Sequence, residues 1–223
     1  NYDKESLLKF DIANEIFNSK WDDFVKIKAK KEYTSIELFA GAGGMALGME
    51  KAGIKHLLLN EIEKNSCNTL RSNRPKWNIL EDDIRNINFS EYKNKIDIVT
   101  GGFPCQAFSS AGKKLGFEDT RGTLFFDFAR CINEVMPKIF IGENVKGLFT
   151  HENGKTLEVI KQSIKDIGYT LIEPRVLKAM YYKVPQKRER LILVGVRNDL
   201  AKHKLANLGA QTDKIKMQTR LTE

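Results

Sequence analysis

A cysteine in a tight apolar turn is the residue of this sequence that is best placed for chemistry. Cys105 lies within residues 101–110, which directly follow the strand-like run of residues 96–99. Two glycines permit a sharp turn and Pro104 fixes a backbone dihedral, so the turn can hold a side chain rigidly at a strand end. The alternative is a buried core residue, since free cysteine is often fully buried. Other motifs are therefore needed to identify Cys105 as a nucleophile.

A glycine-rich turn follows the first predicted strand, residues 35–40. The run Gly41-Ala42-Gly43-Gly44 would let a ligand approach the backbone, and the helix predicted after it would present free N–H groups. The spacing is not that of the Gly-x-Gly-x-x-Gly dinucleotide pattern, so a tight turn without a ligand is an equally good interpretation. The turn alone indicates only a candidate pocket for a small molecule.

Two acidic residues favour such a pocket. Glu61 ends the second predicted strand, about 20 residues beyond the glycines, where doubly wound nucleotide-binding folds place an acid that accepts from ribose hydroxyls. A charge at a helix N-terminus is the alternative role of Glu61. Asp83 follows a possible third strand and could accept from an adenine amino group, while Ile62 and Ile84 flank the ring. We predict an adenosine-containing cofactor that lacks a pyrophosphate.

The composition suits a globular protein with a polyanionic partner. The chain has 223 residues, of which 41% are hydrophobic, and this is enough for one α/β domain with a substantial core. A formal net charge of +8 and a pI near 9.3 favour nucleic acid as the partner. We expect no membrane association, because no apolar run reaches spanning length and the N-terminus does not resemble a signal peptide. The first residue is Asn and not Met, which is consistent with a fragment, a processed product or one piece of a split protein.

The cysteines and histidines are too scattered to indicate a metal site or a disulfide framework. They are Cys67, Cys105, Cys131, His56, His151 and His203. No pair has the spacing of metal ligands, and three cysteines far apart do not form a disulfide pattern. We therefore expect no metal and a reducing, cytoplasmic setting.

Strand and helix patterns alternate along the chain. Strands are predicted at residues 35–40, 56–60, 96–99 and 139–141 and near 170–177 and 191–196, with a possible short one before Asp82. Helices are predicted at residues 45–52, before Pro75, at 123–136 and from 156 to 168, besides an N-terminal helix within residues 5–20. The alternation predicts an α/β fold with a doubly wound, mainly parallel sheet and helices on both faces.

Four short motifs lie near the ends of these predicted strands. They are Phe39-Ala40-Gly41-Ala42-Gly43-Gly44, Gly102-Phe103-Pro104-Cys105-Gln106, Glu143-Asn144-Val145 and Pro185-Gln186-Lys187-Arg188-Glu189-Arg190. In this order they resemble the DNA (cytosine-5)-methyltransferases, most closely the short bacterial enzymes of restriction-modification systems. The likeness extends from about Ser35 to Leu200. It implies a Rossmann-like methyltransferase catalytic domain over residues 34–200, preceded by a helix and basic linker (1–33) and followed by a polar tail or linker (201–223).

The resemblance implies methyl transfer from S-adenosylmethionine to C5 of a cytosine that is flipped out of duplex DNA. Cytosine C5 is a poor nucleophile, so in this family a thiolate adds to C6 and makes C5 reactive. Cys105 matches that nucleophile. Glu143 matches the carboxylate that binds the N3/N4 edge of the base. Arg188 and Arg190 match the arginines that hold the base oxygen and the backbone near the nucleophile.

Residue types and resemblance together also assign binding residues. Those expected to bind the cofactor are Phe39, Ala40, Gly41, Ala42, Gly43, Gly44, Glu61, Ile62, Asp83, Ile84, Gly102, Pro104 and Leu124. Those expected to bind DNA are Gln106, Ser109, Lys113, Arg121, Gln186 and Lys187. We expect the segment 109–121 to be a loop that closes over the DNA.

The sequence departs from the family pattern in places. Tyr181 and Lys183 stand near positions where the family usually has Asp and Gly, and Asp82 replaces a common Gly. The target-recognition domain and two later motifs do not follow Leu200, whereas residues 10–17 are similar to the end of the helix that closes the cofactor pocket, as in a circularly permuted order. We therefore expect a second polypeptide or a further segment to carry target recognition.

Two other functions stay open at this point. One branch of the resembled family methylates tRNA at cytosine C5, and activity toward tRNA instead of duplex DNA would identify it. A non-catalytic nucleic-acid-binding subunit could keep the same fold. It would not, however, need Cys105, Glu143 and Arg190 together.

Overall fold

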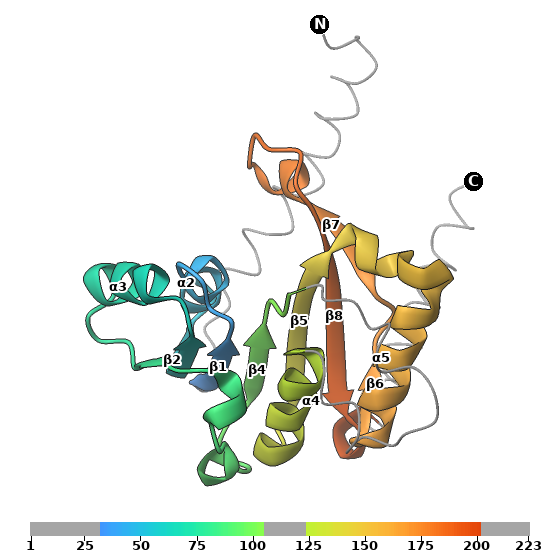
Figure 1. Cartoon of the computed structure of the whole chain (residues 1–223), viewed down its shortest axis with the longest axis horizontal. Coiled ribbons are helices and arrows are strands. Elements are labelled where there is room, and N and C mark those ends of the chain that lie inside the picture. Colours follow the sequence, from blue (N-terminus) through green and yellow to red (C-terminus); the bar gives the residue numbers. More distant parts are fainter. Residues whose placement is uncertain (1–31, 105–123, 202–223) are drawn as a thin grey trace, which may run out of the picture.

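The computed structural model describes residues 32–104 and 124–201 of the chain (Figure 1). These residues form an eight-stranded sheet in the order β3-β2-β1-β4-β5-β8-β6, and β7 pairs with β8 beside that path. The strands are β1 (Tyr33–Leu38), β2 (Ile54–Glu61), β3 (Ile79–Glu81), β4 (Ile98–Gly101), β5 (Ile139–Val145), β6 (Tyr169–Leu171), β7 (Arg175–Lys178) and β8 (Glu189–Arg197). The predicted N-terminal helix, the loop 109–121 and the tail from residue 202 lie outside the described residues.

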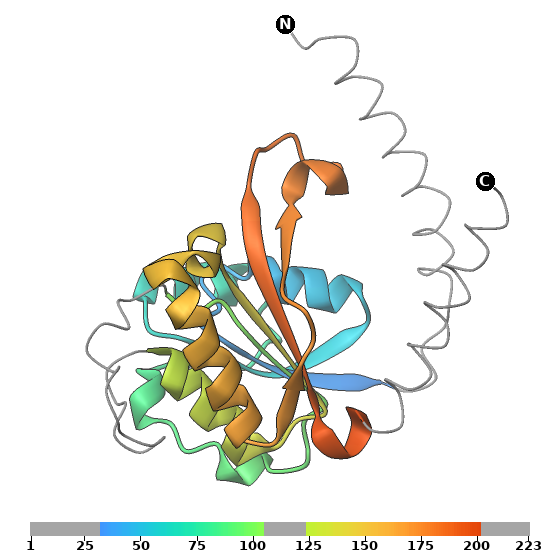
Figure 2. The ribbon, with the colours of Figure 1, turned by 90° about the vertical axis from the view of Figure 1, so that its right-hand side faces the viewer.

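Helices cover both faces of this sheet. The α-helices are α2 (Gly44–Lys51), α3 (Lys64–Asn73), α4 (Leu124–Val135) and α5 (Lys155–Asp166), and the short 3-10 turns are η1 (Ile84–Asn86), η2 (Ser90–Tyr92), η4 (Lys146–Phe149), η5 (His151–Gly154) and η6 (Ala179–Tyr182). The connections through α2 and α3 lead toward the β3 edge of the sheet, and the connection through α4 leads in the opposite direction. Because such connections are right-handed, α2 and α3 lie on one face of the sheet and α4 lies on the other. Figure 2 shows α4 and α5 on one face and α2 on the other. The doubly wound, mainly parallel fold predicted from the sequence is confirmed.

The direction of winding reverses between β1 and β4. β1 pairs in parallel with β2 on one side and with β4 on the other, so that Leu38 lies opposite both Asn60 and Gly101. In open α/β sheets, ligands bind at the carboxyl ends of the strands at such a switch point. The glycine turn after β1 and the chain that leads from β4 toward Cys105 therefore leave the sheet side by side.

Helix α4 fixes the end of β4. Its buried residues recur every three or four positions and include Phe125, Phe128, Ile132 and Val135. The Phe128 ring lies 5.5 Å from the Phe103 ring, and a Cβ on Gly101 would be only 2.9 Å from Phe128. Glycine at position 101 thus lets α4 pack directly on the strand end. A second, smaller core cluster lies under α2 and α3 and consists of Ala40, Ala46, Leu59 and Leu70.

Two strands differ from their predicted form. β5 continues through Val145 instead of ending near residue 141, because β8 pairs with it along its whole length. The single strand predicted near 170–177 is two strands, β6 and β7. Leu171 pairs with Gly195, and Arg175 pairs with Ile192. The chain thus advances four residues from Leu171 to Arg175 while β8 advances only three, and the extra residue forms a bulge next to Pro174.

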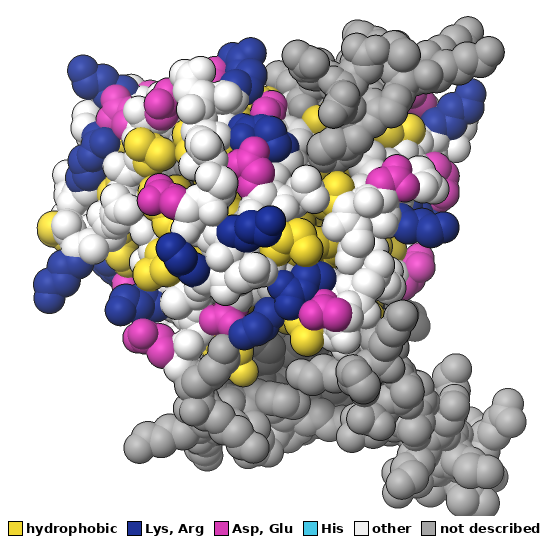
Figure 3. All heavy atoms as spheres, turned by 90° about the horizontal axis from the view of Figure 1, so that it is seen from below, with side chains coloured by type: hydrophobic (Ala, Val, Ile, Leu, Met, Phe, Trp, Pro, Cys, Tyr) yellow, Lys and Arg dark blue, Asp and Glu magenta, His cyan; other side chains and the backbone are white. Residues whose placement is uncertain are grey.

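A hairpin made of β7, η6 and the start of β8 projects beyond the carboxyl ends of the parallel strands (Figures 1 and 2). Figure 3 shows the opposite end of the molecule, where Lys and Arg side chains alternate with Asp and Glu side chains and no single charge dominates. Among the helices of residues 32–104 and 124–201, none is long and apolar enough to cross a membrane.

Candidate active site

The glycine turn after β1 has a left-handed backbone at three positions. Phe39, Gly41 and Gly43 have φ angles of 56°, 55° and 88°. A Cβ on Gly43 would lie 2.6 Å from Leu70 Cδ2 in α3, so both the backbone and the packing require glycine there. A Cβ on Gly41 or Gly44 would meet no heavy atom within 4 Å, so there is open space beside these two residues. The turn is rigid on the α3 side and accessible on the other.

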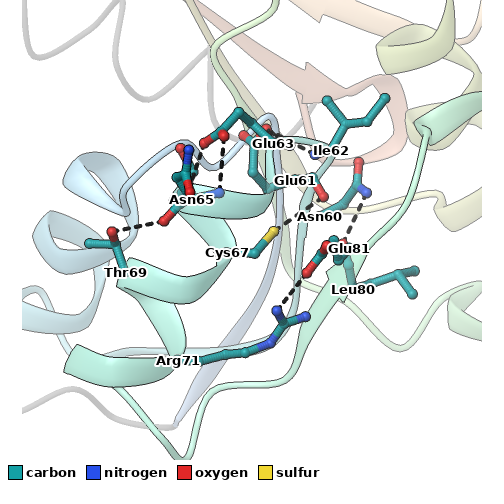
Figure 4. A network of polar contacts seen from close by, with 11 residues as sticks. Asn60, Glu61, Ile62, Glu63, Asn65, Cys67, Thr69, Arg71, Leu80 and Glu81 are labelled. Carbon is teal, nitrogen blue, oxygen red and sulfur yellow. Dashed lines mark hydrogen bonds and ion pairs between the residues drawn. The ribbon is translucent and has the colours of Figure 1, made fainter.

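Glu61 ties this turn to the end of β2. Its Oε2 accepts a hydrogen bond from the Gly41 N–H at 2.7 Å, and its Oε1 accepts from the N–H groups of Ile62 and Glu63 at 2.9 and 2.8 Å. Figure 4 shows Glu61 at the N-terminal end of α3, where the Glu63 carboxylate caps the helix. A carboxylate beside an accessible glycine turn fits the ribose of an adenosine-containing cofactor such as S-adenosylmethionine.

The residues predicted to surround adenine are less closely grouped. Ile62 is 63% exposed, whereas Ile84 is 3% exposed and belongs to the main core cluster. Asp83 forms an ion pair with Arg85, whose hydrogen bonds lower the pKa of Asp83 to about 2. Asp83 is therefore ionised at neutral pH and can accept hydrogen bonds. The burial of Ile84 indicates a packing role, and a contact between Ile84 and a bound ring stays a prediction.

The chain that leads from β4 toward Cys105 is tethered to β5. Asn144 is 2% exposed, and its Nδ2 donates to the Phe103 carbonyl oxygen at 2.9 Å. The Phe103 side chain is also 2% exposed and lies 5.3 Å from the Phe125 ring. Pro104 is the last residue described before Cys105, which itself lies outside the described residues. Phe103, two residues before the candidate nucleophile, is thus positioned by β5 on one side and by α4 on the other.

Glu143 and Arg190 form an ion pair next to this tether. In the antiparallel ladder of β5 and β8, Val145 lies opposite Arg190 and Glu143 lies two residues away on the same face. Arg190 Nε is 2.7 Å from Glu143 Oε1, and the two side chains are 27% and 24% exposed. The other carboxylate oxygen, Oε2, lies beside Gly102, where an added Cβ would be 3.2 Å away. Two predicted catalytic residues and a predicted cofactor residue therefore meet at the carboxyl ends of β4 and β5.

The other predicted residues are spread over the same end of the sheet or are not described. Gln186, Lys187 and Arg188 are exposed on the hairpin, and Arg188 contacts η6 through its carbonyl, which accepts from the Ala179 N–H at 2.8 Å. Leu124 begins α4 and packs against the main core. Four predicted DNA-binding residues lie outside the described residues together with Cys105: Gln106, Ser109, Lys113 and Arg121.

A buried carboxyl beneath the switch point was missed by the sequence reasoning. Glu37, in β1, is 2% exposed, and it accepts hydrogen bonds from the Ala46 N–H at 3.0 Å and from the Thr100 hydroxyl at 3.2 Å. Burial raises the pKa of Glu37 to about 7, although the bonds from Thr100 and Ala46 act in the opposite direction. The available signal was an acid between two apolar residues, Ile36 and Leu38, of a predicted strand. The tethering role of Asn144 was likewise not assigned.

The described cysteines are unsuited to nucleophilic chemistry. Cys67 and Cys131 are buried, and burial raises the pKa of both thiols. In the described part of the chain, no group of three or more His, Cys, Asp or Glu side chains is placed to hold a metal ion. A cavity of about 710 Å³ lies at the far end of β8, between α5 and β6, and contains none of the predicted site residues.

The comparison with known families and proteins points to one group. Residues 33–222 match the sequence model of the C-5 cytosine-specific DNA methylase family. The chain is 62% identical over 200 residues to the type II methyltransferase M.Eco47II of Escherichia coli, a match that covers 90% of this chain and 48% of that protein. It is 46% identical over 192 residues to M.Sau96I of Staphylococcus aureus, covering 83% and 44% of the two chains. The chain thus spans about half the length of the curated relatives it matches.

Solved structures agree with the fold. An Escherichia coli prophage protein described as a DNA modification methyltransferase superposes with a TM-score of 0.63 at 30% identity, covering 76% of this chain and 48% of the other. A variant of DNMT2 from Spodoptera frugiperda superposes with a TM-score of 0.62 at 22% identity, covering 76% of this chain and 51% of the other. The second similarity concerns the fold alone.

Proposed function

Because the chain belongs to the C-5 cytosine-specific DNA methylase family, we propose that it transfers a methyl group to C5 of a flipped-out cytosine in duplex DNA. Members of the family use S-adenosylmethionine as the methyl donor. The observation that carries the proposal is the meeting of the Glu143–Arg190 pair and the Asn144-tethered chain toward Cys105 next to the glycine turn. The named relatives are type II methyltransferases, so we assign the chain to a bacterial restriction-modification system.

The thiolate of Cys105 would begin the reaction. It would form a bond to cytosine C6. The electrons of the C5–C6 double bond then form a C4–C5 double bond, the electron pair displaced to N3 takes up a proton, and C5 of the resulting enamine is nucleophilic. S-adenosylmethionine supplies an electrophilic methyl group. Loss of the C5 proton to a base then returns an electron pair to the ring, and the Cys105–C6 bond breaks to release the thiolate. A base that has left the DNA stack is required, because C6 is not accessible within the duplex.

Glu143 and Arg190 would hold the cytosine during these steps. One Glu143 oxygen is bound by Arg190 and the other lies beside Gly102, so the carboxylate is oriented before a substrate arrives. We assign Glu143 to the N3/N4 edge of the base, where its carboxyl group would donate a proton to N3 as the thiolate adds at C6. Arg190 orients Glu143 and would contact the base oxygen. Arg188, together with Arg190, would hold the base oxygen and the backbone near the nucleophile.

Cofactor and DNA contacts complete the proposal. The glycine turn, Glu61 and Asp83 would hold the adenosine part of the cofactor, with Ile62, Ile84, Gly102, Pro104 and Leu124 around it. The exposed Gln186 and Lys187 on the hairpin would contact phosphates, as would Gln106, Ser109, Lys113 and Arg121. Since the chain spans about half of its curated relatives, we propose that a further segment or a second polypeptide supplies target recognition. The setting would be the bacterial cytoplasm.

Transfer of labelled methyl groups tests this function. The full chain is incubated with labelled S-adenosylmethionine and duplex DNA, alone and with the portion of M.Eco47II that lies outside the match, and tRNA is the parallel substrate. We expect 5-methylcytosine in the duplex and no label in tRNA. The Glu158→Gln variant, altered on the exposed face of α5, should label DNA as the unchanged chain does.

Three results would contradict the proposal. Label in tRNA would identify an RNA methyltransferase. Label on the cytosine amino group would identify a different reaction. Stable DNA binding by the reconstituted pair without any methyl transfer would identify a non-catalytic subunit.

A further inference from the structure

The carboxyl group of Glu37 lies between the two strands that diverge at the switch point. In the parallel ladders Glu37 is directly opposite Thr100 of β4 and Leu59 of β2. Its side chain is 2% exposed, and its Oε2 accepts from the Thr100 hydroxyl at 3.2 Å. Thr100 precedes Gly101 and Gly102, from which the chain continues toward Cys105. Glu37 is therefore bonded to the strand that leads to the candidate nucleophile.

The same carboxyl group is bonded to the first turn of α2. The N-cap of this helix is Gly43, which offers no side chain to accept a hydrogen bond, and the Ala46 N–H donates instead to Glu37 Oε1 at 3.0 Å. His56 of β2, which is 8% exposed, contacts the same residue of α2, because its Nε2 is 2.8 Å from the Ala46 carbonyl oxygen. The first turn of α2 is continuous with the glycine turn. Glu37 thus acts as the missing helix cap from a neighbouring strand.

Ionisation strengthens both of these bonds. A carboxylate accepts shorter and stronger hydrogen bonds than a neutral carboxyl group, and negative charge is favoured at a helix N-terminus. Burial opposes ionisation, and it raises the pKa of Glu37 into the neutral range. The titratable side chain that contacts the same helix turn is His56; Thr100, on the β4 side, does not titrate. Glu37 can therefore change its protonation state near neutral pH.

We propose that Glu37 is a positioning residue, whose ionised carboxylate fixes the cofactor turn relative to the strand that leads to Cys105. The inference rests on the proposed function, because it takes the glycine turn as the cofactor site. In the ionised form, Glu37 holds α2 and β4 at a fixed separation, and the cofactor turn is ready to bind. Protonation weakens both bonds, so cofactor affinity falls as the pH falls through the neutral range.

Binding of S-adenosylhomocysteine to the full chain by calorimetry, between pH 6 and pH 8.5, tests the proposal. We expect the dissociation constant of the unchanged chain to be about fivefold higher at pH 6 than at pH 8.5, the size of a typical helix-cap effect. Glu37→Gln should bind at every pH with the weaker affinity that the unchanged chain has at pH 6. Thr100→Val removes a bond that favours the carboxylate, so the midpoint of the profile should move to higher pH.

Asp97→Asn is the matched control. Asp97 also links β1 and β4, through its bond from the Thr34 N–H at 3.1 Å, but it does so at the amino ends of the strands. This variant should keep the pH profile of the unchanged chain even if it is less stable. A purely structural role of Glu37 would lower the stability of Glu37→Gln without changing the shape of the binding profile.

Hydrogen exchange of the Ala46 amide provides a readout that needs no cofactor. Glu37→Gln should speed this exchange about fivefold at pH 8 relative to amides of α5, and Asp97→Asn should not. If the unchanged chain binds S-adenosylhomocysteine and Glu37→Gln keeps its affinity and pH profile, the inference is wrong and the proposed function stands. If the chain binds no cofactor at any pH, the proposed function fails, and unchanged exchange at Ala46 would then also overturn the role of Glu37.

Discussion

Replacing Glu37 by Gln should change how the free energy of unfolding depends on pH. The pKa of Glu37 rises from an ordinary value of 4.5 to about 7 in the folded protein, because the side chain is buried. The folded state therefore binds the proton more tightly than the unfolded state. This contribution to stability is fully present below pH 4.5 and is lost as the pH rises through about 7. The rise in pKa corresponds to ~3 kcal/mol.

The assay compares urea unfolding of the unchanged chain and of Glu37→Gln at pH 5, 6, 7 and 8. Gln cannot ionise, so the variant should resemble the protonated form and be nearly as stable as the unchanged chain at pH 5. Between pH 5 and pH 8 the variant should gain about 2.5 kcal/mol of stability relative to the unchanged chain, because the unchanged chain must bury a charge at the higher pH. Taking the difference between the two chains removes the contribution of all other titrating groups.

Glu158→Gln is the control for the amino-acid change itself. Its carboxylate is 70% exposed and pairs only with Lys161 among the ion pairs described, so its stability should follow the unchanged chain within about 0.5 kcal/mol at every pH. A difference between Glu37→Gln and the unchanged chain that stays constant from pH 5 to pH 8 would refute the reasoning. It would mean that Glu37 titrates alike in the folded and unfolded states.

Two further substitutions separate chemistry from packing. Glu143→Gln should reduce methyl transfer by at least about 100-fold. The melting temperature should stay within about 2 °C, because the pair with Arg190 is about a quarter exposed and contributes little to stability. Loss of activity that is accompanied by unfolding of the variant would contradict the assignment. Gly195→Ala should destabilise the fold by about 3 kcal/mol in thermal unfolding, because its Cβ would lie 1.9 Å from the buried Phe140 ring. Gly147→Ala, which meets no atom within 4 Å, should change stability by less than about 0.5 kcal/mol, and equal effects of the two would refute the packing argument.

Much of the fold could be predicted because its signals are local. The apolar period of residues 124–135 predicts an amphipathic helix, and α4 is that helix. Gly53 and Gly168, with φ of 81° and 85°, end α2 and α5 as expected of glycines after a helix. The antiparallel direction of β8 could not be read in this way. It follows from the pairing of β8 with β5, which depends on residues about 50 positions apart in the chain.

The candidate site was only partly predictable for the same reason. Glu61 is the last residue of β2, and Glu143 lies near the end of β5. Strand ends of this kind can be located from sequence. The pairing of Glu143 with Arg190 depends on the register of an antiparallel ladder, which no local pattern specifies. Glu37 was missed because a single acid between two apolar strand residues does not reveal what its carboxyl group will contact. Ile84 shows the reverse case, since its neighbours suggested a pocket and the fold buries it.

The most direct test of the central claim uses a duplex that contains 5-fluorocytosine. Fluorine replaces the hydrogen that must leave C5, so the thiolate cannot be released after methyl transfer and the protein stays bonded to the DNA. With S-adenosylmethionine and any polypeptide needed for target recognition, the chain should gain the mass of one DNA strand at Cys105. Cys67→Ser and Cys131→Ser should retain this adduct, and Cys105→Ser should form none. An adduct of the same mass in Cys105→Ser, or none in an unchanged chain that methylates normal DNA, would contradict the account.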